Sequence, residues 1–202
     1  MKRAFLFFKM VFILLLLTGF TTDKAAINKP APDFSLKAAD GKTYSLSDFK
    51  GKYVILEWIN FDCPFVRKHY KSGNMQNLQK KYTGKGVIWL SINSSAPGKQ
   101  GNFPAEEVNR RLQKQGASPT AYLFDPSGTV GRAYGAKTTP HMYLIDPEGV
   151  LVYAGGIDDI RSAKISDIPK AKNYVSLVLE AALAGKPLPV QSTRPYGCSV
   201  KY

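Results

Sequence analysis

Two cysteines, Cys63 and Cys198, are the residues of this chain best suited to redox chemistry. Cys63 stands where a continuous apolar run ends and Pro64 opens a helical pattern, since proline is well accommodated at the first position of a helix. The N-terminus of a helix favours negative charge and therefore the thiolate, which is the reactive form of cysteine. Arg67 follows in the next turn and adds positive charge. The sequence predicts a reactive thiolate at Cys63; the alternative is a buried, inert cysteine.

The elements expected to position Cys63 alternate between strands and helices. Asp40-Gly41 between two short β-prone runs predicts an N-terminal β-hairpin. The rest of the chain predicts strand 52–60, helix 65–82, strand 86–93, a loop at 94–104, helix 105–115, strand 121–124, helix 129–134, strands 141–145 and 150–153 joined by a turn at 146–149, and helix 170–184. This order predicts the α/β class, with a central mixed β-sheet flanked by helices.

Composition narrows the class of protein further. The chain has 202 residues, of which 44% are hydrophobic, so it has enough apolar material for one core and is neither a disordered, a collagen-like nor a multi-span membrane protein. Its net charge is +13, but the lysines are scattered and no arginine-aromatic motif or zinc finger accompanies them. We therefore expect a solvated basic surface and no nucleic-acid partner. Neither cysteine has zinc-ligand spacing, so no metal or other cofactor is expected.

Residues 1–22 have the pattern of a secretory signal peptide. Lys2, Arg3 and Lys9 occur there without any acidic residue, and the apolar run from Met10 to Leu17 is shorter than the roughly 20 residues that span a bilayer. An uncleaved membrane anchor is the alternative, and membrane contact is expected only through this segment. Export to the periplasm or another extracytoplasmic compartment would let the two cysteines form a disulfide and would require an external thiol reductant.

Three stretches of the sequence resemble the thioredoxin-like superfamily. They are the opening KPAPDFSLKAADGKTYSLSDFKGKYVILEW, the junction WINFDCPFV, and Thr138-Thr139-Pro140 directly before HMYLID. They are most similar to its redoxin members, the alkyl hydroperoxide reductase/thiol-specific antioxidant (AhpC/TSA) group and the exported TlpA/ResA-like thiol-disulfide oxidoreductases. The resemblance covers residues 28–184 and implies a thioredoxin-like redoxin domain, which an extended tail at 185–202 follows.

The motifs depart from both branches of this family. Val66 stands where thioredoxins and TlpA-like proteins have the second cysteine of Cys-x-x-Cys. Peroxiredoxins surround their reactive cysteine with a proline, a threonine or serine, and an arginine from a later strand; Leu56, Asn60 and Pro140 occupy those positions here. Asn60 retains a hydrogen-bond donor, and Arg132 is the candidate arginine from the preceding segment. These departures weaken a standard peroxiredoxin mechanism.

Thr139-Pro140 resembles the cis-proline turn that faces the reactive cysteine in thioredoxin folds. A cis bond there would present the backbone of Thr139 to an extended peptide or thiol substrate. The alternative is an ordinary trans proline before a strand. His141, just beyond, is expected to be a structural strand residue rather than a base or a metal ligand.

Cys198 lies in the tail, where Pro187, Pro189 and Pro195 favour an extended, loosely packed course. A tether from Gly185 to Cys198 spans up to about 40 Å. A domain of this size has a radius of gyration of about 16 Å. Cys198 is therefore within reach of the reactive cysteine of the same chain or of a partner. Three roles stay open: a remote resolving cysteine, a structural disulfide, and a free or differently paired thiol.

The sequence supports three hypotheses about function. The first is an exported thiol-disulfide oxidoreductase, in which Cys63 attacks a substrate disulfide and Cys198 resolves the product. The second is a peroxiredoxin-like peroxide reductase with antioxidant activity. The third is a non-catalytic or copper-binding module, because Cys63, His69, His141 and Met142 carry soft or imidazole ligands. The expected partners are a thiol or disulfide substrate protein or a peroxide, together with the reductant.

Overall fold

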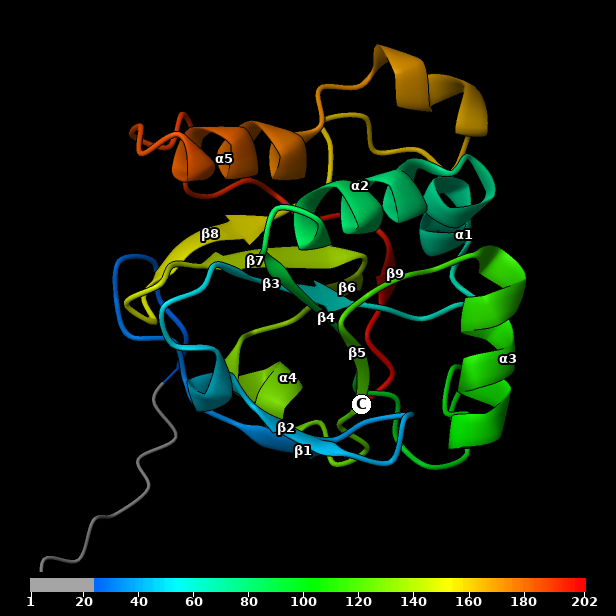
Figure 1. Ribbon diagram of the computed structural model, residues 1–202. Coiled ribbons are helices and arrows are strands. Elements are labelled where there is room, and N and C mark those ends of the chain that lie inside the picture. The colour runs from blue at the N-terminus through cyan, green and yellow to red at the C-terminus, as the bar shows by residue number, and fades with distance from the viewer. Residues whose placement is uncertain (1–23) are drawn as a thin grey trace, which may run out of the picture.

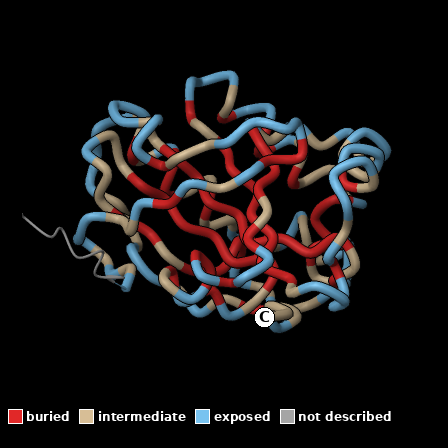
Figure 2. Tube along the Cα trace, turned by 90° about the horizontal axis from the view of Figure 1, so that it is seen from below, coloured by how far each residue is buried: buried red, intermediate tan, exposed pale blue. Residues whose placement is uncertain are grey.

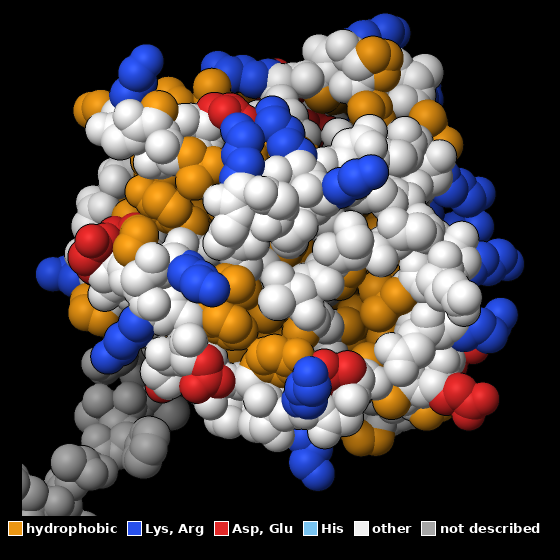
Figure 3. Space-filling model, in the orientation of Figure 1, with side chains coloured by type: hydrophobic (Ala, Val, Ile, Leu, Met, Phe, Trp, Pro, Cys, Tyr) orange, Lys and Arg blue, Asp and Glu red, His pale blue; other side chains and the backbone are white. Residues whose placement is uncertain are grey.

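The computed structural model describes residues 24–202. The predicted signal peptide, residues 1–22, lies outside these described residues. Within them, no helix combines the length and the apolar character needed to cross a membrane. Figure 3 shows Lys and Arg side chains spread over the visible face and its edges, as the scattered basic residues of the sequence lead one to expect.

A mixed five-stranded sheet forms the centre of the domain (Figure 1). Its order is β5 (Ala121–Phe124), β4 (Ile88–Asn93), β3 (Val54–Trp58), β7 (His141–Ile145) and β8 (Leu151–Gly155). β3, β4 and β5 are parallel, whereas β7 runs antiparallel to β3 and to β8. The mixed sheet predicted from the sequence is confirmed, and every residue of β3 is buried, as expected for a strand covered on both faces.

Alternate side chains of β3 enter two separate cores, one on each face of the sheet. Ile55 joins the cluster covered by α1 (Pro64–Lys71), α2 (Asn74–Thr83), α3 (Ala105–Gln115) and α5 (Tyr174–Leu183). Leu56 joins the cluster on the opposite face, under α4 (Thr129–Ala133) and the N-terminal hairpin. Figure 1 shows α1, α2 and α5 on one side of the sheet and α4 on the other, and Figure 2 shows that the buried chain runs through the middle of the molecule.

The N-terminal hairpin predicted around Asp40-Gly41 is confirmed. It consists of β1 (Ser35–Lys37) and β2 (Thr43–Ser45), which pair antiparallel and lead into the short 3-10 helix η1 (Leu46–Phe49). Gly41 has φ 84°, a left-handed conformation that glycine adopts without steric cost. The side chain of Asp40 accepts hydrogen bonds from the backbone N–H of Lys42 and the hydroxyl of Tyr44, and these bonds hold the turn.

Two helices differ from the sequence-based expectations. The helix expected over 65–82 is divided into α1 and α2, because Gly73 takes a left-handed conformation with φ 76° between them. The helix expected over 170–184 begins later, at α5, where the side chain of Asn173 caps the backbone N–H of Ser176 at 2.9 Å. A separate 3-10 helix, η2 (Ile165–Lys170), precedes it.

The prediction of a loosely packed tail is wrong. The tail returns across the domain, and its residues Cys198–Ser199 form strand β9, which pairs antiparallel with β6 (Thr138–Thr139). Figure 1 shows this red segment beside β6. Tyr196 is buried, and the hydroxyl of Tyr202 donates to the carbonyl of Ala136 at 2.8 Å. The prolines fix an extended path without preventing these contacts, because an extended strand pairs with an edge through its remaining N–H and C=O groups.

Candidate active site

Cys63 is the N-cap residue of α1, and Pro64 is the first residue of this helix. Its backbone N–H donates to the carbonyl of Asn60 at 3.0 Å, and its carbonyl accepts from the N–H of Arg67 at 2.9 Å. The side chain of Asn60 accepts from the N–H of Asp62 at 3.0 Å. The turn between β3 and α1 therefore has a fixed shape and places the Cys63 side chain at the positive end of the helix dipole.

The Cys63 thiol faces the turn before β7. Its Sγ donates a hydrogen bond to the carbonyl oxygen of Thr139 at 3.0 Å, and the Thr139–Pro140 peptide bond is cis, as predicted. Cys63 is fully buried. The Oγ1 atom of Thr139 is also buried, and it has no hydrogen-bond partner among the described residues. Thr139 thus presents its carbonyl, not its hydroxyl, to the reactive sulfur.

The structure brings Cys198 to the same point. In the β6–β9 pairing, Cys198 stands directly opposite Thr139, whose carbonyl accepts from Cys63. Both cysteines are free thiols. Burial, together with the interaction with the Cys63 thiol, raises the pKa of Cys198 well above its usual range. Within the pair, Cys198 is therefore held in the protonated form.

Glycine is required at position 197, between the buried Tyr196 and Cys198. Gly197 has φ 141°, and a Cβ atom there would collide with the carbonyl oxygen of Thr139. A side chain would therefore push β9 away from β6. The glycine beside Cys198 is visible in the sequence, but only the fold shows that it lies against the backbone of Thr139.

Asn60 and Arg132, two other residues predicted to support the site, make contacts elsewhere in the structure. Asn60 is buried, and its amide is used within the loops, where Nδ2 donates to the carbonyl of Gln100 at 3.2 Å. Arg132 lies on α4, stacks on Tyr202 with its guanidinium 4.4 Å from the ring centre, and donates to the carbonyl of Ser127. The structure thus gives both side chains structural contacts of their own.

Arg67 borders a basic hollow beside the Cys63 turn. The hollow has a volume of about 540 Å³ and lies between α1 and α3. Its charged lining residues are Asp62, Arg67, Lys71, Arg110, Arg111 and Lys114. Asp62 pairs with Arg111 at 2.8 Å, so most of the lining charge is positive.

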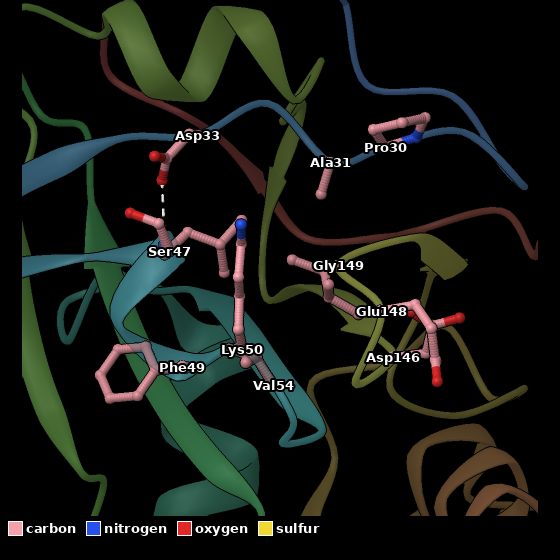
Figure 4. Close-up of a pocket in the computed structure, with 12 residues that line it drawn as sticks. Pro30, Ala31, Asp33, Ser47, Phe49, Lys50, Val54, Asp146, Glu148 and Gly149 are labelled. Carbon is pink, nitrogen blue, oxygen red and sulfur yellow. Dashed lines mark hydrogen bonds between the residues drawn. The ribbon is translucent and has the colours of Figure 1, made fainter.

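A second hollow lies at the opposite end of the sheet from Cys63 (Figure 4). It has a volume of about 310 Å³, and both Val54 at the start of β3 and Ile145 at the end of β7 line it. Asp33 accepts from the N–H of Ser47 at its rim, at 3.1 Å. Cys63 follows the other end of β3, so this hollow is separated from the thiol pair by the length of the strand.

The histidines do not form a metal site with the cysteines. No group of three or more His, Cys, Asp or Glu side chains within residues 24–202 is arranged to hold a metal ion. The Nδ1 of His141 lies 2.9 Å from the hydroxyl of Tyr143, and burial lowers the pKa of His141 to about 3. His141 is therefore a neutral, buried strand residue, which agrees with its predicted structural role.

The lowered pKa of His141 predicts a pH dependence of stability. The unfolded chain takes up a proton on this histidine near pH 6.5, whereas the folded chain does so only near pH 3. Its contribution to stability is therefore present above about pH 6.5 and is lost as the pH falls. The difference in unfolding free energy between the wild type and His141→Asn should shrink by about 1.4 kcal/mol per pH unit from pH 6 to pH 4. Urea unfolding at each pH measures it, and a difference that does not change with pH would contradict the prediction.

Four buried polar residues near the site escaped the sequence analysis. They are Glu57 on β3, Lys68 on α1, Asp158 after β8, and Tyr196 in the tail. Glu57 could have been found from the sequence, because it is the one charged residue within an otherwise apolar strand. The other three lie far apart in the sequence and meet only in the fold, so no spacing pattern identifies them.

Comparison with known proteins identifies the family. The family model described as "AhpC/TSA family" matches residues 27–154, which is more than half of the chain. The chain belongs to the AhpC/TSA family. It is an oxidoreductase of thioredoxin-like fold, and this family membership confirms the resemblance noted in the sequence.

Individual relatives agree with this family. The thiol-disulfide oxidoreductase ResA of Bacillus thuringiensis subsp. konkukian is 28% identical over 162 residues, which cover 75% of this chain and 88% of that protein. An uncharacterized conserved protein from Geobacillus kaustophilus has a solved structure that matches with a TM-score of 0.78 and 31% identity, covering 88% of this chain and 92% of that one. A putative thiol:disulfide interchange protein DsbE from Chlorobium tepidum matches with a TM-score of 0.53 and 28% identity, over 65% of this chain and 85% of that one.

Proposed function

We propose that this AhpC/TSA-family protein is an exported thiol-disulfide oxidoreductase in which Cys63 is the nucleophile and Cys198 is the resolving cysteine of the same chain. The observation that carries the proposal is the position of Cys198 opposite Thr139, the residue whose carbonyl holds the Cys63 thiol. Val66 occupies the position where a local second cysteine would be, so the tail supplies the thiol that α1 lacks. The similarity to thiol-disulfide oxidoreductases such as ResA supports this reaction class.

The reaction takes place in two exchange steps. The Cys63 thiolate attacks one sulfur of a substrate disulfide, forming a mixed disulfide and releasing the other substrate sulfur as a thiolate. The Cys198 thiolate then attacks the Cys63 sulfur, forming the Cys63–Cys198 disulfide and releasing the second substrate thiolate. The substrate gains two electrons and two protons, and the protein dithiol loses them. An external thiol reductant restores the dithiol for the next cycle.

The electrostatics of the pair suit this order of events. Cys63 stands at the N-terminus of α1, and the raised pKa of Cys198 keeps the resolving thiol protonated until Cys63 has reacted. Once Cys63 is in a mixed disulfide, its thiol no longer contributes to the raised pKa of Cys198. Cys198 is then the remaining free thiol of the pair, and it is the one that attacks the Cys63 sulfur.

Export is part of the proposal because of residues 1–22. Their basic start and short apolar run are typical of a signal peptide, and an oxidising compartment supplies substrates for a dithiol enzyme. Fractionation of cells that produce the full chain tests this point. Recovery of the protein in the cytoplasmic fraction at full length would contradict export.

A trapping experiment tests the reaction. The Cys198→Ser variant, treated with one equivalent of oxidised glutathione, should accumulate a mixed disulfide at Cys63, whereas the wild type should pass to a Cys63–Cys198 disulfide. Intact mass and peptide mapping distinguish the two products. The double variant Cys63→Ser/Cys198→Ser is the control and should form no adduct. Absence of a Cys63-dependent adduct in Cys198→Ser would overturn the proposal.

Peroxide reduction is a second candidate, which the AhpC/TSA family match supports. The Cys63 thiolate would attack one peroxide oxygen and release hydroxide, giving a sulfenic acid that Cys198 converts to a disulfide with loss of water. Leu56 and Pro140 occupy positions of the peroxidatic motif, and Arg132 binds Tyr202 and Ser127, so this pocket offers less support for peroxide. Peroxide consumption no faster than that of free cysteine would exclude this candidate.

A further inference from the structure

The tail that carries Cys198 is fastened to the helix that carries Cys63 by a buried polar network. The hydroxyl of Tyr196, two residues before Cys198, donates to Oδ1 of Asp158 at 2.5 Å. Asp158 also pairs with the Nζ of Lys68 at 3.3 Å through its other oxygen. All three residues are buried, with side-chain exposures of 0% for Lys68 and 2% for Asp158. We call this set, Lys68, Asp158 and Tyr196, the tail latch.

Every donor of the latch has an acceptor. The three hydrogens of the Lys68 ammonium match three acceptors: Oδ2 of Asp158, the carbonyl of Ile160 and the hydroxyl of Tyr196, at 3.2 to 3.3 Å. The Oδ1 of Asp158 also accepts from the N–H of Ile160 at 3.1 Å. A buried ion pair is stable only when its remaining groups are also bonded, and Tyr196 supplies one such bond to each partner. The latch is therefore complete only while the tail is in place.

The latch connects both ends of the thiol pair over short distances. Lys68 lies five residues after Cys63 on the same helix, about 7.5 Å along its axis. Tyr196 and Cys198 are separated by Gly197 alone, so at most about 7 Å of chain lies between the latch and the second thiol. Fixing Tyr196 against Lys68 thus fixes Cys198 relative to Cys63.

The same tail also covers Cys63. The Cys63 side chain has 0% exposure, and β9 occupies the edge of β6 that an extended substrate would pair with. We expect a protein disulfide to reach Cys63 when β9 leaves this edge. The tail therefore opposes the first exchange step and favours the second.

From these contacts we propose that Lys68, Asp158 and Tyr196 are positioning residues that act through the tail, limiting access to Cys63 and holding Cys198 in place for resolution. This inference rests on the proposed resolving role of Cys198. Weakening the latch should change the two steps in opposite directions. A general loss of packing would also expose the buried Cys63, so a matched control variant and a check of folding in each variant are needed to separate it from release of the tail.

Tyr196→Phe is the variant that tests the latch with least disturbance. It removes the hydroxyl but keeps the ring, which packs edge-on against Phe65 with 5.8 Å between centres, and it leaves the Lys68–Asp158 pair intact. Tyr53→Phe is the matched control. The Tyr53 hydroxyl donates to the carbonyl of Ala182 at 3.0 Å and so makes a comparable bond to α5 rather than within the latch.

The first measurement is alkylation of Cys63 by iodoacetamide, carried out in the Cys198→Ser background so that only one thiol reacts. Tyr196→Phe should accelerate the labelling about tenfold, which corresponds to about 1.4 kcal/mol of lost tail binding. The second is the lifetime of the glutathione mixed disulfide in proteins that retain both cysteines. Tyr196→Phe should lengthen this lifetime about tenfold, since a released tail presents Cys198 at a lower effective concentration. Tyr53→Phe should change neither rate.

The outcomes separate the latch from the proposed function. Unchanged rates of both steps in a folded Tyr196→Phe protein, with the Cys63–Cys198 disulfide still forming, would overturn the latch and leave the oxidoreductase mechanism in place. If no such disulfide forms even in the wild type, the resolving role fails; the labelling rate then still decides whether the latch covers Cys63. Asp158→Asn is the second variant and should shift the labelling rate in the same direction, with folding verified by circular dichroism.

Discussion

Replacement of Cys63 by serine is expected to slow disulfide exchange by at least about 1,000-fold, because a serine hydroxyl is a weak nucleophile without a general base. The turn that faces Cys63 is followed directly by His141. This histidine is buried, and its Nδ1 is already hydrogen-bonded with the hydroxyl of Tyr143. The measurement is reduction of a model peptide disulfide, followed by chromatography of the product thiols.

The fold should tolerate the change. The Cys63 thiol donates to the carbonyl of Thr139, and a serine hydroxyl is able to make the same bond. Unfolding by urea therefore serves as the control for structural damage. An exchange rate within about tenfold of the wild type in Cys63→Ser would move the nucleophile to another residue and contradict the mechanism.

The comparison with Cys198→Ser makes this prediction specific. That variant should retain the first exchange step, because Cys63 and its helix are unchanged, but should stop at the mixed disulfide. Loss of the first step in both variants would indicate that Cys198 is needed before resolution. Loss in Cys63→Ser alone is the result expected from the order of the two steps.

The central sheet and the place of Cys63 were predictable from local patterns. Strand and helix order follows from the periodicity of apolar residues, and the Cys63-Pro64 junction is a local signal at which a strand gives way to a helix. The hairpin at Asp40-Gly41 is likewise set by the preference of glycine for a left-handed conformation. These features depend on residues close together in the chain, so the sequence contains them directly.

The course of the tail was not predictable in this way. Its prolines indicate an extended path but do not say what lies beside it. The burial of Tyr196 depends on Lys68, which is 128 residues away, and on Asp158, which is 38 residues away. Nonlocal bonds of this kind leave no period or spacing in a single sequence. The sequence therefore indicated that Cys198 is within reach of Cys63, and the fold supplied the strand pairing that brings it there.

The break between α1 and α2 shows the limit of helical periodicity. The sequence analysis predicts one long helix over 65–82, opened by Pro64. Gly73 nonetheless takes a left-handed conformation, and the chain turns between the two helices. Glycine in the interior of a helix costs roughly 1 kcal/mol relative to alanine, and tertiary packing decides whether the helix continues.

The largest expected loss of stability comes from Glu57, the buried carboxylate on β3. Its Oε2 atom accepts from the Trp89 indole at 2.8 Å and from the Ser91 hydroxyl at 2.9 Å. The hydroxyl of Tyr70 and the amide of Gln79 also donate to it, at 3.2 and 3.3 Å. Glu57 is fully buried, so it joins β3, β4, α1 and α2 through one polar group inside the core.

Glu57→Ala should therefore lower the free energy of unfolding by about 4 kcal/mol, a large part of the total stability of an ordinary domain. The loss combines a cavity with donors left unpaired away from water, among them the Trp89 indole, which has no second acceptor within the residues 24–202. Urea unfolding at pH 7 measures it. Ser91→Ala, which removes one donor and leaves the carboxyl in place, is the matched control and should cost only about 1 kcal/mol.

Glu57→Gln separates the charge from the hydrogen bonds. Burial raises the pKa of Glu57, so the folded chain holds this proton more tightly than the unfolded chain does. The contribution of the group to stability is fully present below the ordinary pKa of glutamate and declines as the pH rises through the raised value. The glutamine variant lacks this decline, so its stability relative to the wild type should improve with rising pH. A loss below about 1 kcal/mol in Glu57→Ala, or a Glu57→Gln difference that stays constant with pH, would show that Glu57 does not organise the core in this way.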